Sequence, residues 1–326
     1  MEKKGSAFTR VLLAVFVLLL LAAMLYVFGP LYPDGRGGGD RTGLSDWMGD
    51  VDGSRPLSTL NIPGTHDSAT QYIFPAYFLQ DQDSSITRQL ENGCRYLDVR
   101  VELDKTGKKL MMVHAFGKCR KLAAAFSDQL RYDDVADAAL AFLDAHPTET
   151  VIFCVKPENG NDDLETVRAL IEKRVGAEAE RWYVDNHIPT LEAARGKIVL
   201  CRRYVRGLGL DFDWVDQGDE TVLADPTEIH SINGVQLLSV QDRYHYAVED
   251  KWNAVRYTLE NSEAGKDCFS LNFLSTAQGK LPHPRRFAGE MNALFADYAL
   301  EKGRSYGVIL FDFATPELAR QVIESN

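Results

Sequence analysis

Short apolar segments recur along the chain, separated by turn residues or by amphipathic stretches. Eight of them are long enough for a strand: 57–62, 94–101, 110–115, 150–156, 197–203, 235–242, 268–275 and 306–313. Several are apolar on both faces, which is typical of parallel strands covered by helices. The amphipathic stretches predict helices at 85–91, 122–145, 164–174, 246–263 and 284–302. This alternation indicates an α/β fold, and eight such strands favour an irregular TIM (β/α) barrel.

One connection in this pattern is too short for a helix. Only DKTGKK, residues 104–109, lies between the second and third segments. A crossover between parallel strands needs a dozen or more residues. We therefore expect an antiparallel pair or a missing helix at this point.

The N-terminal region carries an unbroken apolar run, Val11–Phe28, behind the cations Lys3, Lys4 and Arg10. Its length meets the lower limit of about 17–25 residues for a membrane-spanning helix and exceeds the roughly 7–15-residue core of a signal peptide. Basic residues before such a helix favour a cytoplasmic N-terminus. We therefore predict a single-pass anchor with the rest of the chain outside the cytoplasm. Cleavage as a signal peptide, followed by secretion, is the alternative.

These features divide the chain into four parts. They are a cytoplasmic basic flank (1–10), the transmembrane anchor or signal segment (11–28), a flexible Gly- and Pro-rich linker (29–45) and a catalytic barrel (46–326). We expect the protein to act as a monomer.

Composition excludes two classes of protein. Apolar residues make up 45% of the 326 residues, too many for an intrinsically disordered chain. The formal net charge of −11 is the opposite of the basic footprint that nucleic-acid binders carry. Five cysteines include no CxxC pair, and four lie in apolar segments, which favours buried thiols over a disulfide framework or a metal site. A single disulfide remains open.

Polar side chains lie at or just after the C-terminal end of nearly every apolar segment. They are His66, Asp67, Asp98, Arg100, His114, Lys156, Arg203, Asp242, Asn272 and Asp312. A single carboxylate at a strand end is ordinarily a cap or an ion-pair member. Barrel enzymes, however, build their active sites at this end of the strands, so the whole set predicts one site.

A colinear series of motifs runs through residues 45–326. It comprises IPGTHDSAT (62–70), CRYLDVRVEL (94–103), VHAFG (113–117), FCVKPE (153–158), KIVLCRRY (197–204), SVQDRY (239–244), LNFLS (271–275) and ILFDF (309–313). In this combination the chain resembles bacterial phosphatidylinositol-specific phospholipase C. The resemblance implies an irregular TIM barrel that cleaves the phosphodiester between inositol and diacylglycerol and releases a cyclic inositol phosphate.

The resemblance also implies catalytic roles. His66 is the expected general base, and Asp312 orients its ring. His114 is the expected general acid, with Asp67 as its carboxylate partner. Imidazole suits both tasks near neutral pH. Arg100 is expected to bind the phosphoryl oxygens and offset the charge that develops on them.

Four further residues match the family's inositol pocket. Lys156, Arg203 and Asp242 are expected to hydrogen-bond the ring hydroxyls, and Tyr244 to lie against the apolar face of the ring. Membership of a rim network of ion pairs is the alternative for each. The sequence departs from the family pattern at Ala115, at Pro157 and at Phe313, which leaves the lipid preference less defined than the reaction.

No metal and no other cofactor is expected. Arg100 stands where calcium-dependent relatives need a cation, and a guanidinium and a metal ion would compete for that place. The alternative is a metal bound through Asp98 and Glu102. The expected partners are phosphatidylinositol, or a glycosylated inositol lipid, and the membrane bilayer. Two other functions remain open: a metal-dependent glycerophosphodiester phosphodiesterase, and a non-catalytic inositol-lipid-binding module tethered to the membrane.

Overall fold

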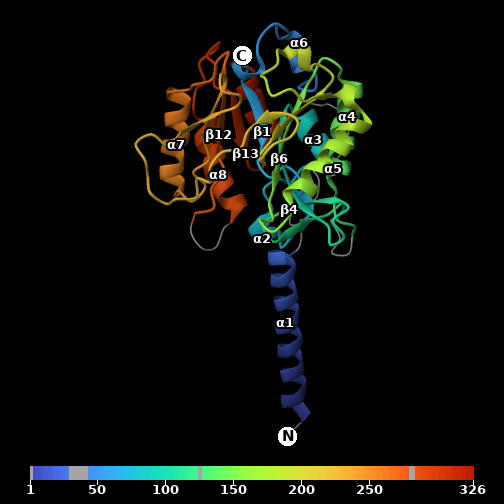
Figure 1. The fold of residues 1–326 in the computed structure, drawn as a ribbon. Coiled ribbons are helices and arrows are strands. Elements are labelled where there is room, and N and C mark those ends of the chain that lie inside the picture. The colour runs from blue at the N-terminus through green and yellow to red at the C-terminus, as the bar shows by residue number, and fades with distance from the viewer. Residues whose placement is uncertain (1–2, 29–42, 124–126, 279–282) are drawn as a thin grey trace.

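The computed structural model describes residues 3–28, 43–123, 127–278 and 283–326. Figure 1 shows a mixed sheet with surrounding helices, and an N-terminal helix that projects away from them. The helices are α1 (Lys3–Phe28), α2 (Ala76–Leu79), α3 (Ile86–Glu91), α4 (Tyr132–Ala145), α5 (Leu164–Ala177), α6 (Leu191–Ala194), α7 (Val248–Glu260), α8 (Pro284–Ala296) and α9 (Pro316–Ile323). The strands are β1 (Ile62–Thr65), β2 (Ile73–Phe74), β3 (Tyr96–Leu103), β4 (Leu110–His114), β5 (Gly117–Cys119), β6 (Val151–Pro157), β7 (Trp182–Tyr183), β8 (Ile198–Arg202), β9 (Leu210–Asp211), β10 (Glu228–Ser231), β11 (Leu237–Gln241), β12 (Cys268–Phe273) and β13 (Val308–Phe311).

Parallel strands form the centre of the sheet. Across it they follow the order β11, β12, β13, β1, β3, β6 and β8. At one end β10 pairs antiparallel with β11, and at the other β7 and β9 pair parallel with β8. Each apolar segment predicted as a strand overlaps one, although β1 begins only at the last residue of the first segment. The predicted antiparallel pair is confirmed, because β3 and β4 form a hairpin.

The predicted fold, an irregular TIM barrel preceded by one transmembrane helix, is wrong as stated. The structure has an α/β fold with a mixed sheet. A closed barrel requires its first and last strands to pair. Among the strands that the structure describes, none of the pairings joins β8 or β9 to β10 or β11. The reason lies in residues 203–227, which contain the two-residue β9 and no helix, so no βα unit fills the gap.

The N-terminal helix requires the second correction. α1 contains the predicted anchor, and its side chains from 11 to 25 are exposed. Within the described ranges, none of the helices has the length and apolar character needed to cross a bilayer, so the prediction of a transmembrane helix over 11–28 is wrong. The run lies only at the lower limit of the about 17–25 apolar residues that spanning takes. Residues 29–42 of the predicted linker lie outside the described residues.

The alternation of side chains along β3 separates an outer from an inner face of the sheet. Leu97 and Val99 pack with residues of α4 and α5 in one buried cluster. Tyr96 belongs to a second cluster, to which the other central strands contribute. Asp98 and Arg100 share the Tyr96 face because successive side chains point to opposite sides of a strand. The inner face therefore carries the polar residues towards the carboxyl ends of the strands.

A buried ion pair fixes the opposite end of the sheet. Arg95 precedes β3 and Glu149 precedes β6, and both side chains are fully buried with Nη2 and Oε2 2.7 Å apart. The backbone N–H of Met48 donates to Glu149 at 3.0 Å, and Arg95 donates to the carbonyl oxygen of Ser45 at 2.7 Å. The pair thus holds the segment before β1 against the amino ends of two strands.

All five cysteines lie within the described residues and carry free thiols, four of them buried. The prediction of buried thiols is confirmed for three of the four cysteines in apolar segments, Cys94, Cys154 and Cys201. Cys268 is only partly buried, and Cys119, which lies outside those segments, is buried as well.

Candidate active site

Side chains at the carboxyl ends of the strands line a cavity of about 320 Å³. Seven of the nine predicted site residues line it: His66, Arg100, His114, Lys156, Arg203, Asp242 and Tyr244. The other two, Asp67 and Asp312, are buried and contact His66. The structure therefore brings all nine residues together, although the prediction drew them from seven separate segments.

His114 reaches this cavity by an unexpected path. Its strand, β4, runs antiparallel to β3, so its C-terminal end points away from the ends of the parallel strands. β3 continues past the end of β1, where Thr65 pairs with Leu97, and β4 returns along that extension, with Met112 beside Val101. The hairpin thereby places His114 at the level of the cavity.

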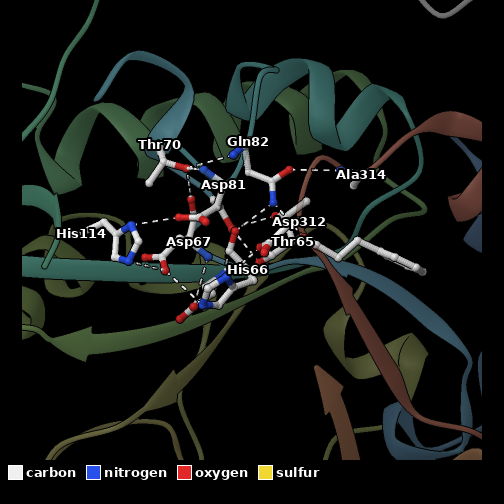
Figure 2. Close-up of polar contacts among 12 residues, drawn as sticks. Thr65, His66, Asp67, Thr70, Asp81, Gln82, His114, Asp312 and Ala314 are labelled. Carbon is white, nitrogen blue, oxygen red and sulfur yellow. Dashed lines mark hydrogen bonds and ion pairs between the residues drawn. The ribbon is translucent and has the colours of Figure 1, made fainter. Parts of the chain in front are cut away.

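His66 follows β1 and lies between two carboxylates (Figure 2). Its Nδ1 is 2.8 Å from Oδ1 of Asp312, and its Nε2 is 3.0 Å from Oδ2 of Asp67. Burial alone would lower the pKa of His66, but Asp67 and Asp312 outweigh this effect and raise the pKa to about 9. The contact to Nδ1 fixes the ring and directs Nε2 towards the cavity.

Two neighbours compete for Nε2 of His66. Nη2 of Arg100 lies 2.9 Å away, and Oδ2 of Asp67 lies 3.0 Å away. A guanidinium only donates and a carboxylate only accepts. The neutral ring therefore accepts a hydrogen bond from Arg100, whereas the protonated ring donates one to Asp67.

His114 has a carboxylate partner that the sequence did not indicate. Its Nδ1 is 2.9 Å from Oδ2 of Asp81 and 2.9 Å from the carbonyl oxygen of Leu79. The predicted partner, Asp67, lies farther away, with Oδ2 3.6 Å from Nε2 of His114. Burial alone would lower the pKa of His114, but Asp67 and Asp81 raise it to about 10. His114 is therefore protonated at neutral pH.

Arg100 is held by carboxylates on several sides. Its Nε lies 3.2 Å from Oδ1 of Asp67, its Nη2 lies 3.1 Å from Oδ2 of Asp98, and its Nη1 lies 3.5 Å from Oε1 of Glu158. Burial alone would lower the pKa of Arg100, but Asp67, Asp98 and Glu158 raise it well above its ordinary value. Asp98, which the sequence left open as a metal ligand, thus pairs with Arg100. The site thus contains a fixed guanidinium charge beside the imidazole of His66.

The remaining polar residues line the other side of the cavity. Lys156 Nζ lies 3.2 Å from Oε2 of Glu158, and the Tyr244 hydroxyl donates to Oδ1 of Asp216 at 2.8 Å. These contacts are the ion pair and hydrogen bond of a polar wall. They are compatible with both alternatives from the sequence, a rim network of ion pairs and a pocket that binds a polyol.

Arg203 stands against an aromatic ring. Its guanidinium carbon lies 3.4 Å from the ring centroid of Trp214, and its Nη1 is buried without a hydrogen-bond partner. Stacking fixes the plane of the guanidinium. A buried donor without a partner is costly, so this nitrogen is placed to receive an acceptor from a ligand.

Sequence reasoning missed four residues of the site: Asp81, Glu158, Trp214 and Asp216. Glu158 follows the end of β6 directly, so the rule that selected Lys156 would have selected it too. The other three lie in loops outside the strand ends, where no local periodicity indicates their direction.

Backbone strain is concentrated beside the catalytic candidates. Asp67, Ala115 and Phe313 have φ values of 43°, 47° and 48°. This left-handed region costs a non-glycine residue roughly 1–2 kcal/mol. Each of the three immediately follows His66, His114 or Asp312. The strain therefore accompanies the sharp turns that direct these side chains into the site.

The site also contains a cluster of potential metal ligands. One ligand atom from each of His66, Asp67 and Asp81 lies within 4.8 Å of the others. The guanidinium of Arg100, however, lies 2.9 Å from Nε2 of His66 and 3.2 Å from Asp67. A metal ion bound there would be repelled by this charge. The donor set does not fit a metal well, and absence of a metal requirement stays a prediction.

Comparison with known proteins shows which family this chain resembles. Residues 55–204 match the family described as phosphatidylinositol-specific phospholipase C, X domain. A 1-phosphatidylinositol phosphodiesterase of Staphylococcus aureus (strain Newman) is 25% identical over 306 residues, covering 86% of this chain and 94% of the relative. An enzyme of the same name from Listeria monocytogenes is 26% identical over 296 residues, covering 86% of this chain and 84% of the relative.

Solved structures have the same fold. A mutant of the phosphatidylinositol-specific phospholipase C from Staphylococcus aureus superposes with a TM-score of 0.73 at 22% identity, covering 89% of this chain and 99% of the other. The enzyme from Listeria monocytogenes gives a TM-score of 0.65 at 22% identity, covering 87% and 98%. Over residues 55–204 the chain is therefore similar to the X domain of phosphatidylinositol-specific phospholipase C, and its fold is that of the bacterial enzymes.

Proposed function

We propose that residues 46–326 form a catalytic domain that cleaves phosphatidylinositol, or a glycosylated inositol lipid, into diacylglycerol and a cyclic inositol phosphate. The observation that carries this proposal is that two imidazoles and one guanidinium line the same cavity. The ring centroids of His66 and His114 are 6.4 Å apart, and Arg100 contacts His66 from the side of β3. The family match and the names of the relatives support the same reaction.

His66 is the proposed general base. In its neutral form Nε2 removes the proton from the inositol hydroxyl next to the phosphate, and the hydroxyl oxygen attacks phosphorus. Asp312 keeps the proton of the neutral ring on Nδ1 and stabilises the imidazolium that results. Proton transfer by a positioned group contributes roughly 10²–10⁴-fold to the rate.

His114 is the proposed general acid. The bond between phosphorus and the diacylglycerol oxygen breaks as the new bond to the ring oxygen forms, and Nε2 of His114 gives its proton to the departing oxygen. The proton count balances, because His66 gains one proton and His114 loses one. In a second step water attacks the cyclic product, with the two imidazoles in exchanged roles.

Arg100 is the proposed electrostatic stabiliser. Asp67 and Asp98 hold its guanidinium in place before substrate arrives. Negative charge builds on the phosphoryl oxygens as phosphorus becomes five-coordinate, and a preorganised cation stabilises this charge without reorganisation. The same charge supports the prediction that the reaction needs no metal.

Lys156, Arg203, Asp242 and Tyr244 are the proposed inositol-binding residues. They line the same cavity as the two imidazoles. A polyol needs many donors and acceptors and an apolar surface for its ring face, and these residue types supply both. The unpartnered Nη1 of Arg203 supports a hydrogen bond to a ring hydroxyl.

Location and assembly stay predictions. We propose that the N-terminal segment is removed and that the enzyme is secreted and acts outside the cytoplasm. The substrate lies in a bilayer, so contact with a membrane surface is required by the reaction. The monomeric state is proposed from the sequence alone.

The test is phosphorus NMR of the products formed from phosphatidylinositol in EDTA. The wild-type chain should release a five-membered cyclic inositol phosphate, and His66→Ala should release none. His187→Ala is the matched control, because this histidine is exposed outside the cavity, and it should behave as wild type. Loss of wild-type activity in EDTA would favour the metal-dependent phosphodiesterase, and binding of inositol lipid without turnover would favour the non-catalytic module.

A further inference from the structure

We propose that Asp81 is the positioning residue of the general acid: its carboxylate holds Nδ1 of His114, so that the imidazolium presents Nε2–H to the departing diacylglycerol oxygen. This inference rests on the proposed function. It makes Asp81, a residue outside the sequence motifs shared with the family, the carboxylate partner of His114. Figure 2 shows the contact, with Asp81 on one side of the His114 ring and Asp67 on the other.

The distances favour Asp81 over Asp67. Oδ2 of Asp81 lies 2.9 Å from Nδ1 of His114, and this oxygen is buried with no hydrogen bond to another group. Asp67 lies 3.6 Å from His114 and already contacts His66 at 3.0 Å and Arg100 at 3.2 Å. Asp81 therefore has its carboxylate available for His114, whereas Asp67 serves the other half of the site.

The arrangement repeats the one around the proposed base. Asp312 holds Nδ1 of His66 at 2.8 Å, and Asp81 holds Nδ1 of His114 at 2.9 Å. In both cases the contact leaves Nε2 facing the cavity. A carboxylate on one ring nitrogen fixes the tautomer and stabilises the imidazolium, and the general acid needs this protonated form.

The loop that carries Asp81 is tied to the strand ends. Its backbone N–H donates to Oγ1 of Thr70 at 3.1 Å, and its carbonyl oxygen accepts from the N–H of Phe313 at 2.6 Å. The next residue, Gln82, donates to the carbonyl oxygens of His66 at 2.9 Å and Phe311 at 2.8 Å. The carboxylate is thus held in one position relative to the residues on both sides of the site.

Several charged groups face His114, and they set its protonation together. Asp81 lies in the loop after α2, Asp67 follows β1, Glu158 follows β6, and Arg100 and His66 supply the opposing positive charge. The carboxylates raise the pKa of His114 to about 10. Burial raises the pKa of Asp81 itself to about 6. Between these two values His114 is protonated and Asp81 is ionised, as the proposed role requires.

A comparison of leaving groups separates this role from a structural one. A diacylglycerol alkoxide needs a proton as it departs, whereas a nitrophenolate does not. Asp81→Asn keeps the size of the side chain and leaves the carbonyl oxygen of Leu79 beside Nδ1, but it removes the carboxylate that holds and stabilises the imidazolium. We expect kcat/KM at pH 8 to fall about 10–100-fold for a soluble short-chain phosphatidylinositol. For inositol 1-(4-nitrophenyl phosphate) it should change by less than about threefold.

The pH profile gives an independent readout. Loss of the Asp81 charge lowers the pKa of His114, so the alkaline limb of kcat/KM for the short-chain lipid should move to lower pH in Asp81→Asn. Asp83→Asn is the matched control, because Asp83 lies in the same loop and pairs with Arg285 instead. This control should retain both the rates and the profile of the wild type.

The outcomes distinguish the possible failures. Equal loss on both substrates, or an unmoved alkaline limb, would overturn the role of Asp81. A wild-type chain that turns over neither substrate would overturn the proposed function and this role with it. If Asp81→Asn does not fold, an NMR titration of the His114 imidazole in Asp67→Asn decides: protonation retained well above pH 6.5 supports the contact with Asp81, and deprotonation near pH 6.5 refutes it.

Discussion

Nη2 of Arg100 lies 2.9 Å from Nε2 of His66, the nitrogen that would take the inositol proton. A guanidinium donates to this nitrogen only when the imidazole is neutral, because a protonated Nε2 has no lone pair. The protonated ring instead contacts Asp67, which lies 3.0 Å away. The protonation state of His66 therefore decides whether its Nε2 contacts Arg100 or Asp67. Only the neutral ring can act as a base, so the rate of the reaction should depend on pH.

We expect a bell-shaped dependence of kcat/KM on pH with an alkaline optimum. His66 must be neutral to act as a base, so activity should rise as pH increases through its pKa of about 9. His114 must be protonated to act as an acid, so activity should fall as pH increases through about 10. At pH 7 only about one His66 in a hundred is neutral, since each pH unit changes the ratio tenfold. Initial rates between pH 5 and 11 with a soluble substrate measure both limbs. An acid limb near 6.5 would contradict the raised pKa of His66.

Asp312→Asn should move the acid limb and lower the maximum. Removal of one carboxylate from His66 lowers the pKa of the base, so the acid limb should shift towards the ordinary value of 6.5. The amide also no longer fixes the ring tautomer, and kcat should fall about 10²-fold or more. The measurement is the same pH series, with thermal unfolding as the control for folding. An unmoved acid limb would show that another group controls the base.

Arg100→Lys should lower kcat although the charge is retained. An ammonium is a point charge and lacks the planar fork of donors in a guanidinium. The lysine therefore cannot contact both Asp67 and Asp98 while it also faces the phosphoryl oxygens. Loss of one preorganised donor costs about 10²–10³-fold in kcat. Steady-state kinetics would check this, with Arg256→Lys on the exposed surface of α7 as the matched control. A variant that loses affinity while kcat is unchanged would place Arg100 in binding and not in stabilisation of the transition state.

The strand pattern and the convergence of the site were predictable because both depend on local periodicity. Apolar runs identified the central strands, and the side chains at their ends meet because parallel strands end at one edge. β1 shows the limit of this reasoning. The strand comprises Ile62–Thr65, with Pro63 and Gly64 in its centre. Gly64 is needed because a Cβ there would lie 2.9 Å from the Cβ of Tyr96, a tertiary contact that no local pattern reveals.

Asp81 and the gap in the sheet were not predictable for the same physical reason. The direction of a loop depends on tertiary hydrogen bonds, such as the one from Phe313 N–H to the carbonyl oxygen of Asp81. The gap depends on which strands pair, and residues 203–227 carry no periodic pattern that would indicate their path. The resemblance in motifs indicated the site residues at the strand ends, but it did not indicate Asp81, which contacts His114.

Glu149→Gln should destabilise the fold without changing the chemistry. The substitution leaves Arg95 as a buried cation without its counterion, since both side chains are fully buried. Breaking a buried pair in this way costs about 3–5 kcal/mol of unfolding free energy. Urea unfolding followed by tryptophan fluorescence measures this loss. Because the pair lies at the amino ends of the strands, kcat of the folded protein should be unchanged.

The double variant Arg95→Met with Glu149→Leu serves as the control for that experiment. It removes both charges, so it should recover most of the stability that Glu149→Gln loses. A loss below about 1 kcal/mol in Glu149→Gln would contradict the assignment of a strongly coupled buried pair.

Ala115→Gly should stabilise the protein. Ala115 has a φ of 47°, in the left-handed region where a Cβ costs roughly 1–2 kcal/mol. Glycine removes this strain but adds about 0.4–1 kcal/mol of entropy to the unfolded chain. The net gain should be about 0.5–1 kcal/mol in urea unfolding. Ala141→Gly, on the exposed side of α4, is the matched control and should instead lose about 1 kcal/mol. Opposite signs for the same substitution would identify the backbone conformation after His114 as the cause, and a loss at both positions would show that no strain is stored there.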